Sequence, residues 1–479
     1  MMNDDRRTRY KFEADVDPEF VRHQLRRLSL IPAGTLPIAR APLACHDLPF
    51  GFAAGHASIR EADAGCLTGL AEGDFGPLVL DRGQAPIMTI APTSAGKGVG
   101  VIIPTLLTWH GPSIVIDPKG EAVQVVASQL LRRGIDVVAI DPFGESEPII
   151  VNGSALARGR LNPMQTLIAA SPTFEADVLD FANTLVGESQ TLGDRFWDNL
   201  GLDLIVGCAG HLATFAATEE CDLFGLREML CDPDLDYRIA LLLDNEYADR
   251  RCFISQAFKT YLGHERDKVR TSVRSTAVQH FTCMAGENLR YALSDTSFDF
   301  QAVTDGRPLA IFLTVQPHRL VAAAPILRLL ISSLLGRITR RRVAPRVPTL
   351  IILDELAQLG SFPLLRPLVT LMRGYGARPL LVLQDASQLR NLYPRDYPTM
   401  INNCAVLTTF GHSSYAMSRE MADLMGDVSA DQLFAMTRDE IAVRIAGKST
   451  RILKRLNYLS DPLFTGLYAR NILASGIGE

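Results

Sequence analysis

Short apolar runs alternate with stretches of helical apolar spacing in two separate parts of this 479-residue chain. The first part begins with an apolar run at 87–90, followed by further predicted elements: a helix at 97–109, a strand at 113–116, a helix at 121–133 and a strand at 136–140. Strand patterns return later, at 309–315, 349–353, 379–384 and 405–409. Alternation of strands and helices predicts an α/β fold with a mostly parallel sheet and right-handed crossovers.

The stretch between the two α/β parts has a different pattern. Residues 164–299 lack clear strand signals and carry apolar residues at helical spacing, such as Val178, Phe181 and Leu185. We therefore predict an all-α domain at 164–299, inserted into one α/β domain. The predicted α/β domain consists of residues 61–163 and 300–479, and residues 1–60 form an N-terminal region without a predicted transmembrane helix.

Composition and charge limit the possible functions. Hydrophobic residues make up 47% and charged residues 21%, which is typical of globular proteins. The formal net charge of −5 provides no global basic field, so any nucleic-acid contact requires local positive charge. The densest basic run has two interpretations, cations at a helix C-terminus or contacts to DNA phosphates. This run contains Arg337, Arg340, Arg341, Arg342 and Arg346.

The apolar runs do not predict a membrane span. No run reaches about 18 uninterrupted apolar residues, and Arg328 interrupts the best one, 321–336, which we interpret as a buried core helix. A possible amphipathic helix at 19–30 is either a solvated face or a contact to a membrane surface or partner. The eight cysteines form no CxxC pair, which favours small buried hydrophobes in a reducing compartment.

The loop after the first strand has the character of a phosphate-binding loop. Its backbone N–H groups would face an anion at a helix N-terminus, and its lysine, Lys97, would reach the β- and γ-phosphates of ATP. Two positions depart from the usual pattern: Ala91 stands where glycine is usual, and Gly98 where a hydroxyl usually helps to bind Mg²⁺. The predicted nucleotide-binding residues are Thr93, Ser94, Ala95, Gly96, Lys97, Gly98 and Val99.

Two carboxylates follow the apolar run 350–353. Because ligands bind at the carboxyl edge of open parallel sheets, Asp354 is predicted to hold Mg²⁺ through water, and Glu355 to polarise the attacking water. We expect the phosphate loop and this acidic pair on neighbouring strands of one sheet.

Three further segments have more than one interpretation. Gln384, the last residue of the predicted strand 379–384, is either a hydrogen-bonding partner of the γ-phosphate or the attacking water, or a capping or turn residue. Arg373 lies on a predicted turn with Gly374 and Gly376. It is either an arginine finger that reaches the nucleotide of a neighbouring subunit or an ordinary surface arginine. The segment 117–121 either borders the nucleotide, lines a substrate path, or forms a structural turn.

Several motifs together resemble one known family. The chain is similar to the coupling-protein ATPases of type IV secretion systems, and the resemblance extends from about Gly55 to the C-terminus. The motifs that carry it are Ala91–Gly100, Asp117–Glu121, Asn162-Pro163, Phe196-Trp197, Leu353–Gly360, Gln384-Asp385, Gln388-Leu389 and Asn402–Cys404. That family often has Lys-Gly in its phosphate loop, so Gly98 fits the resemblance.

The resemblance implies a RecA-like P-loop NTPase with an inserted all-α domain, assembled as a homo-hexameric ring with a central channel. It assigns catalytic roles to Lys97, Glu355, Gln384 and Arg373, a metal role to Asp354, and ATP and Mg²⁺ as cofactors. The implied partners are DNA, a relaxase or another secreted protein, and components of the secretion channel. Typical members begin with transmembrane helices and this chain does not, so we expect a cytoplasmic protein with indirect or peripheral contact to the inner membrane.

The resulting prediction is an ATP-driven coupling ATPase that recruits and translocates DNA substrates to a type IV secretion channel. A recruitment adaptor that binds nucleotide with little or no hydrolysis is the alternative. A packaging-type motor that acts without a secretion channel is a third possibility.

Overall fold

The computed structural model describes residues 83–187, 192–248 and 250–471, and the backbone of strands at 48–53, 65–67 and 78–81. A twelve-stranded sheet forms its centre, in the order β2-β3-β1-β14-β13-β12-β4-β11-β10-β5-β9-β6. The strands from β12 to β6 are parallel to one another: β12 (Val406–Thr409), β4 (Ile87–Ile90), β11 (Ala377–Leu383), β10 (Thr349–Leu353), β5 (Ser113–Asp117), β9 (Leu309–Thr314) and β6 (Asp136–Ile140).

Antiparallel strands extend the sheet beyond β12. They are β13 (Glu440–Ile445), β14 (Arg451–Lys454), β1 (Leu48–Ala53), β3 (Leu78–Asp81) and β2 (Gly65–Leu67). A separate two-stranded hairpin comprises β7 (Ile150–Val151) and β8 (Ser154–Ala155). Strands β4, β6 and β10 have the predicted bounds, and the other predicted parallel strands differ by one or two residues.

The central strands are buried on both faces, which explains their unbroken apolar sequence. In β10, Leu350 and Ile352 enter one core, and Ile351 and Leu353 enter the other. The first core is covered by η1 (Gly98–Ile102), α2 (Ile103–Thr108) and α3 (Glu121–Arg132). The second is covered by α12 (Leu320–Thr339), α13 (Leu365–Thr370), α14 (Ala386–Leu392) and α15 (Tyr397–Asn403). The predicted helix at 97–109 is thus a π-helical turn followed by α2.

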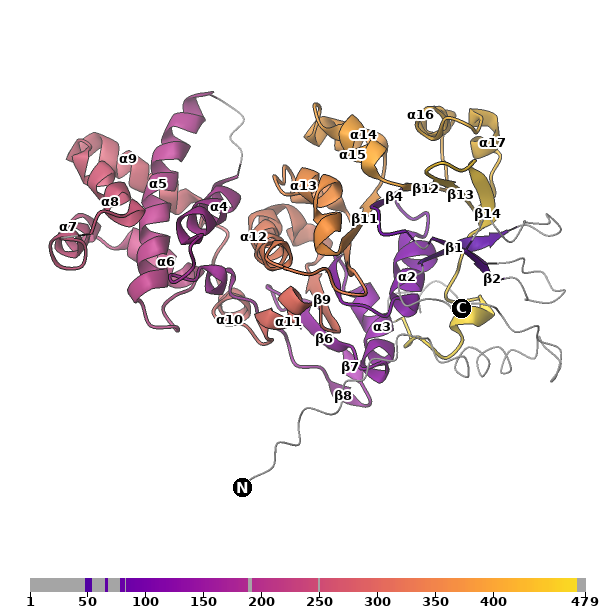
Figure 1. Cartoon of the computed structure of the whole chain (residues 1–479), viewed down its shortest axis with the longest axis horizontal. Coiled ribbons are helices and arrows are strands. Elements are labelled where there is room, and N and C mark those ends of the chain that lie inside the picture. Colours follow the sequence, from indigo (N-terminus) through magenta and orange to yellow (C-terminus); the bar gives the residue numbers. More distant parts are fainter. Residues whose placement is uncertain are drawn as a thin grey trace, which may run out of the picture.

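A group of helices lies at one end of the molecule, away from the sheet (Figure 1). The helices between β8 and β9 are α4 (Phe174–Val186), α5 (Leu192–Phe215), α6 (Leu223–Cys231), α7 (Leu235–Asn245), α8 (Phe253–Gly263), α9 (Thr271–Gln279), α10 (Glu287–Leu293) and α11 (Phe300–Asp305). Helix α5 packs on α4, α8 and α9, and α4 packs on α12 of the α/β part. The described part of 164–299 contains helices and no strand. The domain boundaries themselves stay a prediction.

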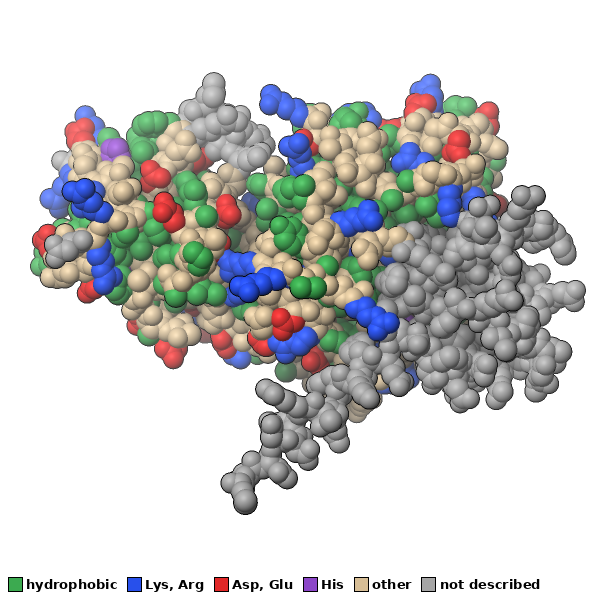
Figure 2. All heavy atoms as spheres, in the orientation of Figure 1, with side chains coloured by type: hydrophobic (Ala, Val, Ile, Leu, Met, Phe, Trp, Pro, Cys, Tyr) green, Lys and Arg blue, Asp and Glu red, His purple; other side chains and the backbone are tan. Residues whose placement is uncertain are grey.

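Helix α12 is a core helix, as predicted for 321–336. Together with the preceding turn, η4 (Pro317–Arg319), it is long and apolar enough to cross a membrane, yet 61% of its most apolar window is buried in the protein. The predicted amphipathic helix at 19–30 lies outside the described residues. On the face shown in Figure 2, lysine and arginine side chains are interspersed with acidic ones, in keeping with the absence of a global basic field.

Candidate active site

The loop that follows β4 folds back on itself at the carboxyl edge of the sheet. The Ala91 N–H donates to the Leu383 carbonyl at 3.1 Å, which ties the start of the loop to the end of β11. Ser94 and Gly96 both have positive φ, 61° and 90°. Successive turns of this kind point backbone N–H groups into a concave, anion-binding nest. Residues 91–97 therefore provide the backbone that the phosphate-loop prediction requires.

Lys97 lies within this loop and is only 9% exposed. Its Nζ donates to the Ala91 carbonyl at 3.2 Å and lies 3.6 Å from Glu355 Oε1. The next residue, Gly98, begins η1, and a Cβ built there would meet only the Glu121 carboxylate, at 4.0 Å. Lys97 thus links the loop to the acidic pair. At position 98, where other phosphate loops carry a hydroxyl side chain, there is room for one.

The acidic pair follows β10. The Glu355 N–H donates to Asp354 Oδ1 at 3.0 Å, and Glu355 has the left-handed φ of 54°. Burial raises the pKa of Asp354 to about 7, and the charges of Glu355 and Asp117 act in the same direction, whereas Lys97 opposes them. The raised pKa means that burial and the neighbouring carboxylates disfavour the ionised form of Asp354, and a cation bound beside it would favour that form.

A divalent cation fits this environment. Within the described ranges no cluster of three or more His, Cys, Asp or Glu side chains forms an all-protein metal cage. Mg²⁺ does not require one, because it usually keeps several waters and binds through one or two carboxylates plus substrate phosphates. The Asp354 carboxyl group, which a bound cation would keep ionised, could supply such a ligand.

Gln384 lies between the loop and the acidic pair. It follows β11, and its Nε2 donates to Glu355 Oε2 at 2.7 Å. The expectation that the loop and the carboxylates lie on neighbouring strands is wrong: β11 separates β4 from β10. Two strands that are far apart in the sequence pair only through the tertiary fold, so apolar periodicity could not reveal their order. Because β11 lies in the middle, its terminal amide reaches the carboxylate.

The segment 117–121 lies beside the acidic pair, because β5 is the neighbour of β10. Asp117 Oδ2 accepts the Val123 N–H at 2.9 Å, which caps the first turn of α3. Burial raises the pKa of Asp117 to about 6, although the backbone N–H groups of α3 oppose this shift. Asp117 therefore caps a helix and also adds negative charge beside Asp354.

Arg373 is not part of this cluster. It lies in η6 (Met372–Tyr375), is exposed, and precedes β11, whereas Gln384 follows the same strand. Seven residues of β-strand span roughly 20 Å, so Arg373 lies at the opposite edge of the sheet. Any contact between Arg373 and a phosphate loop would involve a second copy of the chain.

Three arginines of the basic run make contacts to other elements of the protein. Arg341 is 7% exposed and donates to four backbone carbonyls and to Thr349 Oγ1 at 2.7–3.1 Å. Arg340 pairs with Asp177 of α4 at 2.5 Å, and Arg337 lies over the Phe300 ring. These three arginines thus have structural contacts within the protein that differ from both predicted roles of the run. Arg342 and Arg346 are exposed.

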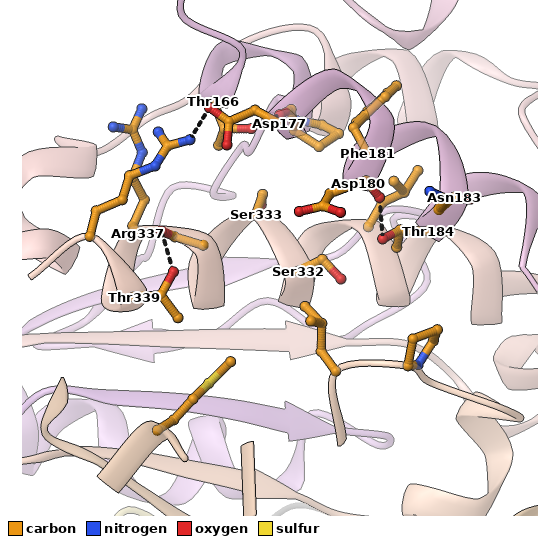
Figure 3. Close-up of a pocket in the computed structure, with 17 residues that line it drawn as sticks. Thr166, Asp177, Asp180, Phe181, Asn183, Thr184, Ser332, Ser333, Arg337 and Thr339 are labelled. Carbon is orange, nitrogen blue, oxygen red and sulfur yellow. Dashed lines mark hydrogen bonds and ion pairs between the residues drawn. The ribbon is translucent and has the colours of Figure 1, made fainter. Parts of the chain in front are cut away.

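A separate pocket of about 220 Å³ lies between α4 and α12, and its lining includes Arg337 and Arg340. In Figure 3, Asp180 and Thr184 of α4 face Ser332 and Ser333 of α12 across this pocket. The phosphate loop and the acidic pair do not line it. The pocket thus belongs to the junction of α4 with the α/β part.

One contact to the loop was not predicted from the sequence. The Arg455 guanidinium donates to the Ala95 carbonyl and lies 3.5 Å from the Gly96 carbonyl oxygen. A Cβ on Gly96 would lie 2.7 Å from Arg455 Nη1, so the loop has a glycine where this side chain approaches. Arg455 is a lone arginine beyond the last strand, and nothing in its sequence neighbourhood indicates this contact.

Comparison with known proteins agrees with this arrangement. The family model for Type IV secretory system Conjugative DNA transfer matches residues 55–433. The chain belongs to this family. The resemblance noted in the sequence is therefore confirmed.

Curated relatives in the family are similar over most of this chain. The conjugal transfer protein TraG of Escherichia coli is 23% identical over 402 residues, covering 80% of this chain and 61% of TraG. VirD4 of Agrobacterium fabrum is 27% identical over 323 residues, covering 67% of this chain and 46% of VirD4. The chain thus spans only about half to three-fifths of the length of these relatives.

Solved structures share the fold. The plasmid coupling protein TrwB in complex with ADP and Mg²⁺ matches with a TM-score of 0.58 at 16% identity, covering 79% of this chain and 88% of the TrwB chain. This likeness confirms the predicted fold class, a RecA-like α/β P-loop fold with a mostly parallel sheet and additional helices.

Proposed function

We propose that this chain is the ATP-hydrolysing motor of a coupling protein that delivers DNA substrates to a type IV secretion channel. The observation that carries the proposal is the convergence of Lys97, Glu355 and Gln384 at the carboxyl edge of one sheet, where Glu355 contacts both of the others. Membership of the conjugative DNA transfer family supports the biological role. The ADP and Mg²⁺ bound to TrwB support the choice of ligands.

In this proposal each group has a distinct chemical task. The N–H groups of 93–99 and the Lys97 ammonium hold the phosphates, and Asp354 holds Mg²⁺ through water. When bound, Mg²⁺ neutralises charge on the phosphate oxygens. Glu355 accepts a hydrogen bond from the attacking water and polarises it. Gln384 keeps the Glu355 carboxylate in place through its 2.7 Å hydrogen bond.

Lys97 must exchange partners when nucleotide binds. Its Nζ now contacts the Ala91 carbonyl and Glu355, and the phosphates would replace the carboxylate as its counter-charge. Glu355 would then be free to orient water while it remains bonded to Gln384. Turnover therefore depends on both side chains, whereas nucleotide binding depends chiefly on Lys97.

The central test measures binding and turnover separately. Lys97→Ala is expected to weaken Mg–ATP binding and abolish phosphate release. Glu355→Gln is expected to keep binding but lower turnover by about 10²- to 10⁴-fold, the usual contribution of a general base. Lys259→Ala, which changes an exposed lysine of α8, is the control and should behave as the wild type. Wild-type phosphate release by either site variant would contradict the assignment.

A wild-type protein that binds Mg–ATP tightly but never releases phosphate, with or without DNA, would instead support the recruitment adaptor. This measurement should be made over a range of protein concentrations, because turnover by a ring assembled from separate chains rises with concentration.

We further propose that the motor is a homo-hexamer in which Arg373 acts on the nucleotide of the neighbouring subunit. The position of Arg373 at the far edge of the sheet supports this, because it cannot serve its own site. Mixing two inactive variants, Arg373→Ala and Lys97→Ala, should restore part of the turnover, since some interfaces then pair two intact residues. A mixture as inactive as its components would refute the role across subunits.

The substrate and location follow from the same proposal. DNA with a bound relaxase or another secreted protein would be the cargo, and channel components at the inner membrane would be the docking partners. Sedimentation of the chain with vesicles, in the presence and absence of purified channel components, would test whether membrane contact is indirect. Tight binding to vesicles alone would contradict it.

A further inference from the structure

The chain returns to its phosphate loop more than 350 residues later, at the end of β14. The Arg455 N–H donates to the Asp439 carbonyl at 2.6 Å, which fixes its backbone. Its side chain then extends to the loop, where Nη1 donates to the Ala95 carbonyl. The guanidinium also lies over the Phe410 ring, 4.8 Å from its centroid. Three separate contacts therefore hold Arg455 against the loop.

The surrounding residues leave room for this side chain and little else. A Cβ on Gly96 would lie 2.7 Å from Arg455 Nη1, and one on Gly100 would lie 2.9 Å from its Cδ. The segment that follows stays in contact with the loop's helix, because the Tyr458 N–H reaches the Val99 carbonyl at 3.4 Å. The glycines at 96 and 100 thus accommodate the arginine as well as the tight turn.

Because peptide bonds are planar, the hydrogen bond from Arg455 to the Ala95 carbonyl also constrains the next N–H group of the loop. In a planar trans peptide the C=O of one residue and the N–H of the next point in opposite directions. A donor that binds the Ala95 carbonyl therefore fixes the direction of the Gly96 N–H, which must point to the other side of the loop. Fixed N–H donors bind an anion more tightly than mobile ones, because less conformational freedom is lost on binding.

We propose that Arg455 is a positioning residue for the phosphate loop, which binds the Ala95 carbonyl from behind and holds the loop's N–H groups in the orientation that accepts nucleotide phosphates. This inference rests on the proposed function of the loop. An arginine suits the task better than a lysine, because its planar guanidinium stacks on Phe410 while it donates.

The test compares Arg455→Gln with the wild type by titration calorimetry with Mg–ATP. Charge-assisted hydrogen bonds have typical net values that correspond to about a tenfold to hundredfold change in the dissociation constant, and we expect a loss of that size. Arg451→Gln is the matched control, because Arg451 lies at the other end of β14, and it should bind as the wild type does. Thermal unfolding of each variant reports whether it is folded.

Two further measurements separate positioning from simple packing. Arg455→Lys should bind more tightly than Arg455→Gln, because it keeps a charged donor. Millimolar guanidinium should partly restore Mg–ATP binding to Arg455→Ala and leave the wild type unchanged. The proposal is overturned if Arg455→Gln binds Mg–ATP as tightly as the wild type does. It is equally overturned if binding is lost and neither the lysine variant nor added guanidinium recovers any of it.

Lys97→Ala, measured in parallel, tests the underlying function. If that variant binds Mg–ATP like the wild type, the proposed function fails. If Lys97→Ala loses binding while Arg455→Gln does not, only the role of Arg455 is wrong.

Discussion

Arg341 offers the sharpest test of what the basic run does. If the run contacts DNA phosphates, substitution should weaken DNA binding and leave stability unchanged. If the run stabilises the fold, substitution should lower the stability and leave DNA binding unchanged. The structure favours the second outcome, because Arg341 is 7% exposed and its guanidinium donates to five groups of the protein. Its carbonyl partners belong to Val303, Thr304, Tyr375 and Gly376.

The expected magnitude follows from these contacts. Arg341→Gln removes the charged donor and leaves several buried carbonyls without their partner, and each unsatisfied buried group costs about 1–3 kcal/mol. Relaxation and water entry offset part of this, and single substitutions rarely cost more than about 4–5 kcal/mol. We therefore expect the free energy of unfolding to fall by about 3–5 kcal/mol, a large share of the roughly 5–15 kcal/mol that stabilises a folded protein.

The assay is denaturant unfolding followed by circular dichroism, with DNA binding measured by fluorescence anisotropy at low denaturant. Arg342→Gln is the control, because Arg342 is the exposed neighbour and surface substitutions usually change stability by less than about 0.5 kcal/mol. Arg341→Lys should fall between Arg341→Gln and the wild type. If Arg341→Gln unfolds at the wild-type denaturant midpoint but binds DNA more weakly, the structural reasoning is refuted.

Three other predictions follow from single positions. Gly98→Ser should fold normally and lower the Mg²⁺ concentration needed for ATP binding, since only Glu121 lies near the added side chain; a higher requirement, measured by titration at fixed ATP, would contradict this. Burial lowers the pKa of His412 to about 4 from 6.5, so the native state binds fewer protons than the unfolded state between these values, and stability should fall as the pH falls through this window. His412→Gln should flatten that part of the stability profile, and an unchanged slope would contradict the prediction. Burial raises the pKa of the Cys208 thiol to about 12, so alkylation of the native protein should label exposed Cys231 before Cys208, as peptide mass mapping would show.

The sequence was sufficient to predict the structure where the prediction depends on residues that are close together in the chain. Strands such as 349–353 have unbroken apolar runs because both of their faces are buried, and a carboxylate after such a run must lie at the carboxyl edge of the sheet. The basic run was not predicted in this way, because Arg340 pairs with Asp177 and Arg341 donates to Val303, which are distant in the sequence.

The sequence was insufficient to predict strand order and contacts between residues that are far apart in the chain. The position of β11 between β4 and β10 depends on pairing across some 290 residues, and apolar periodicity carries no information about strand order. The hydrogen bond from Gln384 to Glu355 likewise depends on the tertiary fold, and the sequence did not indicate it. The contact between Arg455 and Ala95 joins residues 360 positions apart, and a lone arginine gives no sign of such a partner.

The central place of β11 has a mechanical consequence for the proposed motor. The strand is buried along its whole length, from Ala377 to Leu383, and pairs with β10 on one side and β4 on the other. Arg373 lies just before it and Gln384 just after it. In a ring, the edge that meets a neighbour's nucleotide and the edge that holds the chain's own nucleotide would therefore be joined by one rigid element. In the proposed motor, a shift of Glu355 on hydrolysis would pull on Gln384 directly, and the closely packed sheet around β11 would not absorb such a shift by local compression.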